Sequence, residues 1–204
     1  MQKIKKMIVT SRLVNLLILL LCFISFLFFW FFDFDEGAFA VTSLQMVKDG
    51  QYFIPYIGEE LRLEKPILSY WIQALFLTIF GFSEYSLRAP SLIAALIWGY
   101  SFATFVKENN TRITRSDILI NFFTLPGIFL ISFAATADAF LNLFITLALI
   151  NLYKFEEQKK NKFLNLAAAW IALGFLTKGF AIVAICGLAF LFYCFFNRKI
   201  NSFF

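Results

Sequence analysis

The segment PILSYWIQALFLTIF, residues 66–80, decides how the chain is arranged relative to a membrane. It is apolar enough to suggest a transmembrane helix, but with a rise of 1.5 Å per residue it reaches only about 22 Å. A bilayer hydrocarbon core is about 30 Å thick. We therefore predict a helix lying flat in the interface, with Pro66 in its first turn, Gly81 at its end, and Tyr70 and Trp71 at the headgroup level.

The composition of the whole chain indicates an integral membrane protein. The chain has 204 residues, of which 61% are hydrophobic, 20% aromatic and only 15% charged, and soluble domains do not have this balance. The run VNLLILLLCFISFLFFWFF, residues 14–32, is long enough to span a bilayer. A cleaved signal peptide is the alternative, because lysines precede this run and the pattern AFA at 38–40 follows it. Signal-peptide cores are shorter, so we treat the run as retained.

Further apolar runs predict the remaining spans, for a total of about six. They lie at residues 89–106, 118–133, 139–153, 163–177 and 179–196. Pro126 and Gly127 fall inside one of them and predict a kink there. The expected fold is an all-α integral membrane protein, one membrane domain over residues 1–204, with amphipathic interfacial helices in an outer loop at 33–88.

The distribution of charge supports this topology, because lysine and arginine collect in cytoplasmic loops. If residues 66–80 lie flat, 13 of the 18 lysines and arginines fall on one side, and 9 of the 13 aspartates and glutamates fall on the other. If residues 66–80 spanned the bilayer, this asymmetry would be lost. We predict a multi-pass protein of a bacterial inner membrane with both termini in the cytoplasm. The dispersed basic residues argue against nucleic-acid binding.

The residue types limit the chemistry that is available. The chain has no histidine, and its three cysteines form no CxxC pair, so neither a disulfide framework nor a metal site is indicated. Acid or base chemistry must therefore use carboxylates or lysines. No cofactor is predicted with certainty, although a divalent cation held by Asp35 and Asp138 is left open.

The predicted topology brings three separate pieces of sequence to the outer surface. They are the first part of the long loop, residues 33–65, Asp138 at the start of a span, and Lys178 in the turn LTKGF. Loops of this length are usually functional. Within the loop, GAFAVTSLQMVKDG at 37–50 is predicted to be an amphipathic helix on the bilayer. Its apolar residues are Phe39, Val41, Leu44 and Val47.

Four pieces of sequence, in order, carry a resemblance to a known family. They are DE at 35–36, KDGQYFIPYIGEELRLEKPILSYWIQALFLTIFGFSEYSLRAPS at 48–91, TADAFLNLFITLALI at 136–150, and LGFLTKGF at 173–180. Together they resemble the polyprenyl-phosphate-dependent C-type glycosyltransferases, which include lipid A aminoarabinose transferases and dolichyl-phosphate-mannose protein mannosyltransferases. The pattern EKPxLxYWxQAL is the specific part of this match.

The resemblance implies roles for individual residues. Asp35 matches the family's essential outer acid, with Glu36 beside it, and Asp138 matches a second outer acid. Lys65, in EKP, matches the lysine that holds the lipid-linked phosphate, and Lys178 is assigned to the same phosphate. These residue types suit the chemistry, because a polyprenyl-phosphoryl sugar needs a cation near its phosphate and a carboxylate near the attacking hydroxyl.

Each of these residues also has a simpler interpretation. The acids at 33–36 could mark only the boundary of the first span, and Asp138 could only cap its helix. Lys178 could only extend from a tight turn toward water. Glu64 could only pair with a neighbouring cation.

The chain also departs from the family pattern. Ala38 and Phe39 stand where relatives carry arginine and tyrosine, and Phe180 stands in place of a proline. Relatives continue into further spans and a soluble outer domain. We therefore expect either a fragment or a second chain that completes the protein.

The predicted function is transfer of a sugar from a polyprenyl-phosphate donor to lipid A, another glycolipid or a protein at the outer face of the membrane. A transporter or channel subunit is the alternative, but transporters place ionisable residues near the middle of the bilayer. A noncatalytic membrane scaffold is a third reading.

Overall fold

The computed structural model describes residues 17, 34–110 and 112–196. This part of the chain is helical apart from one short hairpin. Its elements are α2 (Phe34–Asp49), β1 (Tyr56–Ile57), β2 (Glu60–Leu61), α3 (Leu68–Phe80), α4 (Glu84–Asn109), α5 (Arg115–Phe123), α6 (Pro126–Phe133), α7 (Asp138–Gln158), α8 (Asn161–Lys178) and α9 (Ala181–Phe196). The two strands pair antiparallel, with Tyr56 opposite Leu61.

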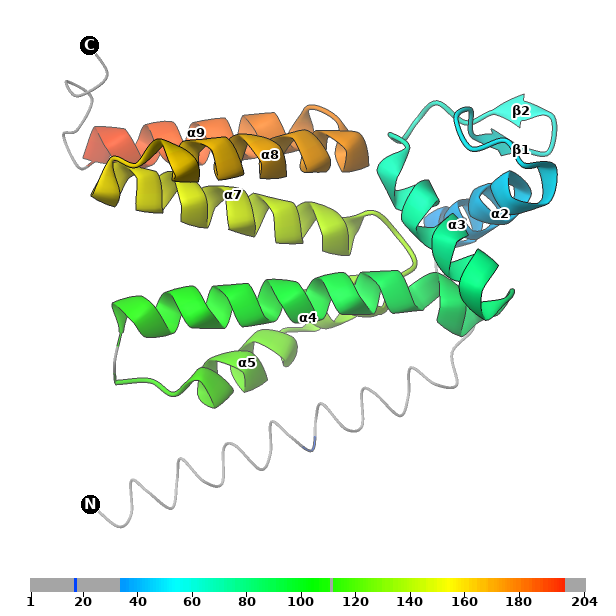
Figure 1. The fold of residues 1–204 in the computed structure, drawn as a ribbon. Helices are drawn as coiled ribbons and strands as arrows, with labels where there is room; N and C mark the ends of the chain where they lie inside the picture. Colours follow the sequence, from blue (N-terminus) through cyan, green and yellow to red (C-terminus); the bar gives the residue numbers. More distant parts are fainter. Residues whose placement is uncertain (1–16, 18–33, 111, 197–204) are drawn as a thin grey trace.

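The long helices run side by side, and the elements of the predicted outer loop gather at one end of them. Figure 1 shows α4, α7, α8 and α9 lying lengthwise together, with α2, α3 and the hairpin at the end where α7 begins. Helix α7 is central and packs against α4, α8 and α9. The main apolar core lies between these helices and contains Trp98, Phe140, Phe144 and Ile182. We call the end that carries α2 and α3 the site end.

Local sequence signals explain where several helices start and stop. Ser83 caps α4 by accepting a hydrogen bond from the backbone N–H of Ser86, and Thr114 caps α5 in the same way. Pro126 occupies the first turn of α6, where its missing N–H has no helical partner to lose. Gly81 and Gly179 follow α3 and α8 with positive φ, a conformation that glycine adopts at little cost.

The structure tests the predicted membrane spans by length and composition. Among the described residues, α4 and α7 are each long and apolar enough to cross a membrane. Helices α5 and α6 would make a third span if counted together, but they are bent by 79° at the break before Pro126. The span predicted at 118–133 is therefore broken rather than kinked. The run at 14–32 lies outside the described residues, and the total of six spans stays a prediction.

Helix α3 forms and ends at Gly81 as predicted, but Pro66 lies before the helix rather than in its first turn, because Ile67 is the N-cap residue. One of its aromatic residues was also placed wrongly. Tyr70 is fully buried rather than at the headgroup level, because its ring packs against Phe39 with centroids 4.9 Å apart. Trp71 keeps a partly exposed ring, and its indole N–H donates to the carbonyl of Tyr52 at 2.6 Å. The two neighbours therefore face opposite environments.

Helix α2 also forms as predicted and ends before Gly50. Of its predicted apolar residues, Phe39 is buried and Leu44 and Val47 pack against the core, but the buried face also includes polar residues. Val41 is exposed, whereas Glu36, Thr42 and Ser43 are fully buried with Phe39. Helical periodicity locates an apolar face, but α2 packs a partly polar face against α3. Polar side chains can be buried there only because other segments supply hydrogen-bond partners.

Candidate functional site

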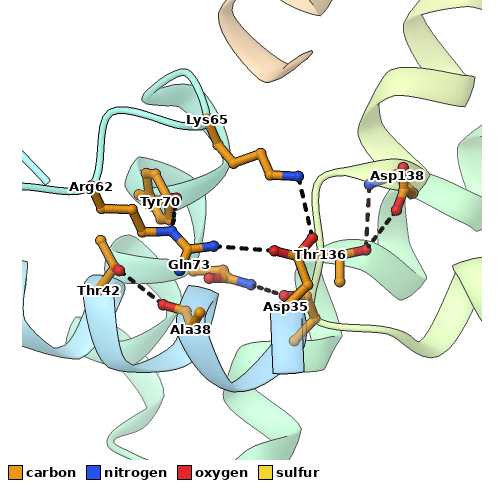
Figure 2. Close-up of polar contacts among 10 residues, drawn as sticks. Asp35, Ala38, Thr42, Arg62, Lys65, Tyr70, Gln73, Thr136 and Asp138 are labelled. Atoms are coloured by element: carbon orange, nitrogen blue, oxygen red, sulfur yellow. Dashed lines mark hydrogen bonds and ion pairs between the residues drawn. The ribbon is translucent and has the colours of Figure 1, made fainter. Parts of the chain in front are cut away.

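Asp35 lies in the first turn of α2 and is held by two cations from the segment between β2 and α3. The guanidinium of Arg62 lies 3.1 Å from one carboxylate oxygen, and the ammonium of Lys65 lies 3.4 Å from the other. Figure 2 shows both side chains reaching toward Asp35. The Asp35 side chain remains 35% exposed. A polar molecule can therefore still approach the Asp35 carboxylate.

Arg62 is fixed in place by buried aromatic residues. Its Nε–H donates to the hydroxyl of Tyr70 at 2.7 Å, and its guanidinium lies 5.5 Å from the centre of the Phe39 ring, within cation–π range. Burial raises the pKa of the Tyr70 hydroxyl, although the hydrogen bond from Arg62 lowers it. Tyr70 therefore stays neutral and serves as a hydrogen-bond acceptor.

Arg62 was not among the predicted site residues. It is one of the cations beside Glu64 in the sequence, but the structure pairs it with Asp35. The available signal was a lone arginine three residues before Lys65 in a loop that is otherwise acidic. Ala38 and Phe39, which follow the DE pair, carry no cationic group. The guanidinium beside Asp35 comes from Arg62 in this loop instead.

Glu36 does not share the environment of Asp35. Its side chain is fully buried, and its carboxylate accepts two hydrogen bonds from Arg88 of α4, at 2.7 and 3.1 Å. One of the same oxygens accepts the backbone N–H of Ala135 at 2.9 Å. Such a bidentate, buried pair is strongly directional. Glu36 therefore joins α2 to α4 and to the segment before α7.

The segment Ala134–Ala137, which leads into Asp138, is held by side chains from three helices. In addition to Glu36, Gln73 of α3 donates to the carbonyl of Ala135 at 2.8 Å. Ser91 of α4 donates to the carbonyl of Thr136 at 3.3 Å. These bonds satisfy backbone groups that burial would otherwise leave without water, and they fix where α7 begins.

Asp138 lies in the first turn of α7 and is paired with Lys178 at the end of α8. The ammonium of Lys178 hydrogen-bonds one oxygen of Asp138, and the Thr136 hydroxyl lies 3.3 Å from the other. The start of α7 has no side-chain cap, so Asp138 is not acting as a helix cap. Lys178 likewise points to a carboxylate instead of only extending into water. Both side chains are about one-third exposed.

A cavity of about 390 Å³ opens beside these ion pairs. Lys65 and Lys178, the two lysines assigned to the donor phosphate, both line it. Glu64 lines it as well, together with apolar residues from the loop before α3. Pockets of this size hold small ligands. The structure thus brings together the cations that the sequence analysis chose, from positions more than a hundred residues apart.

The described residues do not form a metal site. Within residues 17, 34–110 and 112–196, no three histidine, cysteine, aspartate or glutamate side chains come together in a way that could hold an ion. Asp35 and Asp138, which the sequence analysis considered for a divalent cation, each face cationic side chains. The donors present do not suit a divalent cation, so no chemical step is assigned to one.

Comparison with known proteins establishes the family. A family model described as dolichyl-phosphate-mannose-protein mannosyltransferase matches residues 64–204. The chain belongs to this family. The matched region of this mannosyltransferase-family chain includes Lys65, Asp138 and Lys178, whereas Asp35 and Glu36 precede it. The family resemblance drawn from the sequence motifs is therefore confirmed.

Curated relatives carry a more specific name. The undecaprenyl phosphate-alpha-4-amino-4-deoxy-L-arabinose arabinosyl transferase of Yersinia pestis (strain Pestoides F) is 29% identical over 160 residues, covering 74% of this chain and 28% of that protein. The enzyme of the same name from Wigglesworthia glossinidia brevipalpis is 27% identical over 174 residues, covering 82% of this chain and 30% of that protein. The chain spans less than a third of the length of these relatives.

Solved structures show the same fold. The crystal structure of ArnT from Cupriavidus metallidurans bound to undecaprenyl phosphate matches 97% of this chain and 37% of that one, with a TM-score of 0.74 and 17% identity. The apo structure of ArnT matches 83% of this chain with a TM-score of 0.71. This mannosyltransferase-family chain therefore has the helical membrane fold of ArnT over the part that it covers.

Proposed function

We propose that this chain forms the donor-phosphate and carboxylate part of a membrane glycosyltransferase. The donor is a sugar linked to a polyprenyl phosphate, and the acceptor is lipid A, another glycolipid or a protein. One observation carries the proposal. Lys65 and Lys178 line a single cavity, and each contacts an aspartate that is also partly exposed. Relatives named as undecaprenyl phosphate-aminoarabinose arabinosyl transferases support this class of donor.

The two lysines suit the leaving group of this reaction. When the acceptor oxygen bonds to the anomeric carbon, the bond from that carbon to the phosphate oxygen breaks, and both electrons stay with the polyprenyl phosphate. Negative charge therefore grows on the phosphate. Fixed ammonium groups stabilise such charge more in the transition state than in the bound donor. Lys65 and Lys178 are placed to do this because both line the cavity.

The two aspartates suit the acceptor. The attacking hydroxyl loses its proton as the new bond forms, and a carboxylate within hydrogen-bond reach can receive it. We assign this role to Asp35, with Asp138 as the second acid beside the cavity. Direct displacement of this kind inverts the configuration at the anomeric carbon. Glu36 is fully buried, and we assign it a positioning role.

The proposed location is the inner membrane, with the site end facing outward and both termini in the cytoplasm. In the structure, the segments predicted to be outer and inner lie at opposite ends of the long helices. Asp138 and Lys178 mark the site end, and the pairs Lys154–Glu108 and Lys159–Glu156 lie at the other end. This separation supports the orientation that the charge asymmetry predicts.

A transporter is the less favoured alternative. Transporters place ionisable side chains near the middle of the bilayer. The ion pairs of the described residues lie at the ends of the long helices, and the interior between α4, α7 and α9 is apolar. This arrangement favours chemistry at the membrane surface over passage through it.

Binding of undecaprenyl phosphate to Lys65 variants tests the proposal. The protein is prepared in lipid nanodiscs from its native host, so that any segment that completes the site is present. Lys65→Met should weaken binding by at least about tenfold, because a charge-assisted hydrogen bond is lost, while Lys65→Arg keeps part of it. Lys48→Met, at the far end of α2, is the matched control and should bind normally. Unchanged binding by Lys65→Met would remove the assignment.

A further inference from the structure

Each lysine of the cavity is already paired with a carboxylate in this structure. Lys65 lies 3.4 Å from Asp35, and Lys178 hydrogen-bonds Asp138. The cations proposed for the donor phosphate therefore neutralise the same aspartates that are proposed to meet the acceptor. A lysine has three N–H donors on a flexible stem, so it can turn from one anionic partner to another.

We propose that the donor phosphate competes with Asp35 and Asp138 for these two lysines, so that donor binding releases both carboxylates for the acceptor. This inference rests on the proposed function and adds a regulatory step to it. Without donor, each aspartate is held by an ammonium group. With donor bound, the ammonium groups face the phosphate, and the aspartates become able to receive a proton from the acceptor hydroxyl.

The two cations beside Asp35 differ in how firmly they are held. Arg62 is buried, and Tyr70 and Phe39 hold its guanidinium in place. Lys65 has a side chain that is 23% exposed and that lines the cavity. Lys65 is therefore the partner that moves, and Arg62 is the partner that stays. Asp35 keeps its contact with Arg62 after Lys65 has turned to the phosphate.

Asp138 also has a second contact that remains when its lysine leaves. Its second oxygen lies 3.3 Å from the Thr136 hydroxyl, and Thr136 belongs to the segment that Gln73 and Ser91 hold through its backbone. When Lys178 turns to the phosphate, this hydroxyl remains beside the carboxylate. Both aspartates thus keep one fixed contact while each loses one exchangeable contact.

The strengths of these interactions permit the exchange. Ion pairs as exposed as these are weak, about 0.4–1 kcal/mol, whereas charge-assisted hydrogen bonds to phosphate are stronger. The donor phosphate therefore displaces the carboxylates from the lysines, at a small cost to the free energy of donor binding. That cost corresponds to about a two- to fivefold weakening of donor binding for each pair, and it disappears if the competing carboxylate is removed.

The test measures the dissociation constant of undecaprenyl phosphate for four forms of the nanodisc preparation described above: the unmodified protein, Asp35→Asn, Lys65→Met and the double variant. We expect Asp35→Asn to tighten binding about two- to fivefold, because Lys65 no longer has to break an ion pair with Asp35 before it binds the phosphate. In the Lys65→Met background, the same change should have almost no effect. A double-mutant cycle of this kind isolates the competition between the two residues.

A control separates competition from general repulsion between a carboxylate and the phosphate. Glu64 lines the same cavity, and its carboxylate makes no ion pair among the residues that the structure describes. Glu64→Gln should change the dissociation constant by less than about 1.5-fold, because its field is screened by solvent. If Glu64→Gln tightens binding as much as Asp35→Asn does, the effect is repulsion and the inference is wrong.

The outcomes distinguish the inference from the function that it builds on. If Lys65→Met weakens binding but Asp35→Asn does not tighten it, the phosphate site stands and the competition does not. If tightening by Asp35→Asn persists in the Lys65→Met background, the competition is likewise overturned. If the unmodified protein does not bind undecaprenyl phosphate, the proposed function and this inference both fail. Asp138→Asn and Lys178→Met provide the same cycle for the second pair.

Discussion

Glu36 accepts a hydrogen bond from the backbone N–H of Ala135, 2.9 Å away in space and 99 residues away in sequence. Glu36 directly follows Asp35, and Ala135 lies just before Asp138. The bond therefore couples the positions of the two aspartates that pair with the lysines of the cavity. Although Glu36 neighbours Asp35 in the chain, it positions the segment that carries the other acid.

The first prediction concerns the stability that this buried carboxylate provides. Glu36→Gln removes the buried negative charge that accepts two hydrogen bonds from Arg88, so we expect the free energy of unfolding to fall by about 3–5 kcal/mol. Glu84→Gln is the matched control. Glu84 reaches the same arginine at 3.9 Å but is 39% exposed, so its loss should cost less than about 1 kcal/mol. Thermal unfolding in detergent measures both losses of stability. Equal losses would contradict a stabilising role for the buried pair of Glu36 and Arg88.

The second prediction concerns Asp35 as the carboxylate that receives the acceptor proton. Asp35→Asn keeps the shape of the side chain but removes its charge, and general-base contributions are about 100-fold or more. We expect sugar transfer to fall by at least that factor in a preparation that contains every part of the transferase, with the protein level maintained and donor binding no weaker than in the unmodified protein. Asp33, outside the described residues, is the control, and Asp33→Asn should keep most activity. An inactive Asp33→Asn beside an active Asp35→Asn would show that the motif is misaligned by two residues.

The third prediction concerns the orientation of the long helices. A cysteine introduced at Glu59 in the hairpin should react with a membrane-impermeant thiol reagent added from outside intact spheroplasts. A cysteine at Gln158, at the opposite end of α7, should react only after the membrane is opened. The three native cysteines are first replaced. Reaction at Gln158 from outside would mean that residues 66–80 cross the bilayer and that the later loops are inverted.

The fourth prediction concerns the close packing of α8 against α9. A Cβ atom at Gly174 would lie 2.1 Å from the Cδ1 atom of Ile182 and 3.3 Å from its Cβ atom. Gly174→Ala should therefore destabilise the protein by about 1–3 kcal/mol through overpacking. Gly187 of α9 has open space at the same position, so Gly187→Ala should leave thermal stability unchanged or slightly raised. Destabilisation by both substitutions would indicate a general intolerance of these helices rather than a local clash.

The sequence determined the class of fold and most of the helices. Apolar runs longer than about 17 residues, bounded by charges, can be read without tertiary information, because each helix satisfies its own backbone in a membrane. The positions of α4 and α7 follow from the apolar runs at 89–106 and 139–153, although both helices extend beyond these runs, and Gly81 predicted the end of α3. The EKP motif likewise selected Lys65, through its resemblance to the family pattern.

Only the tertiary structure decided which polar residues are buried and which carboxylates face the cavity. Glu36 and Asp35 are neighbours in one helical turn, yet one is fully buried and the other is partly exposed. Tyr70 and Trp71 differ in the same way. The physical reason is that a polar group can be buried only where a partner satisfies it. Here the partners, Arg88, Ala135 and Arg62, come from segments whose approach local periodicity does not encode.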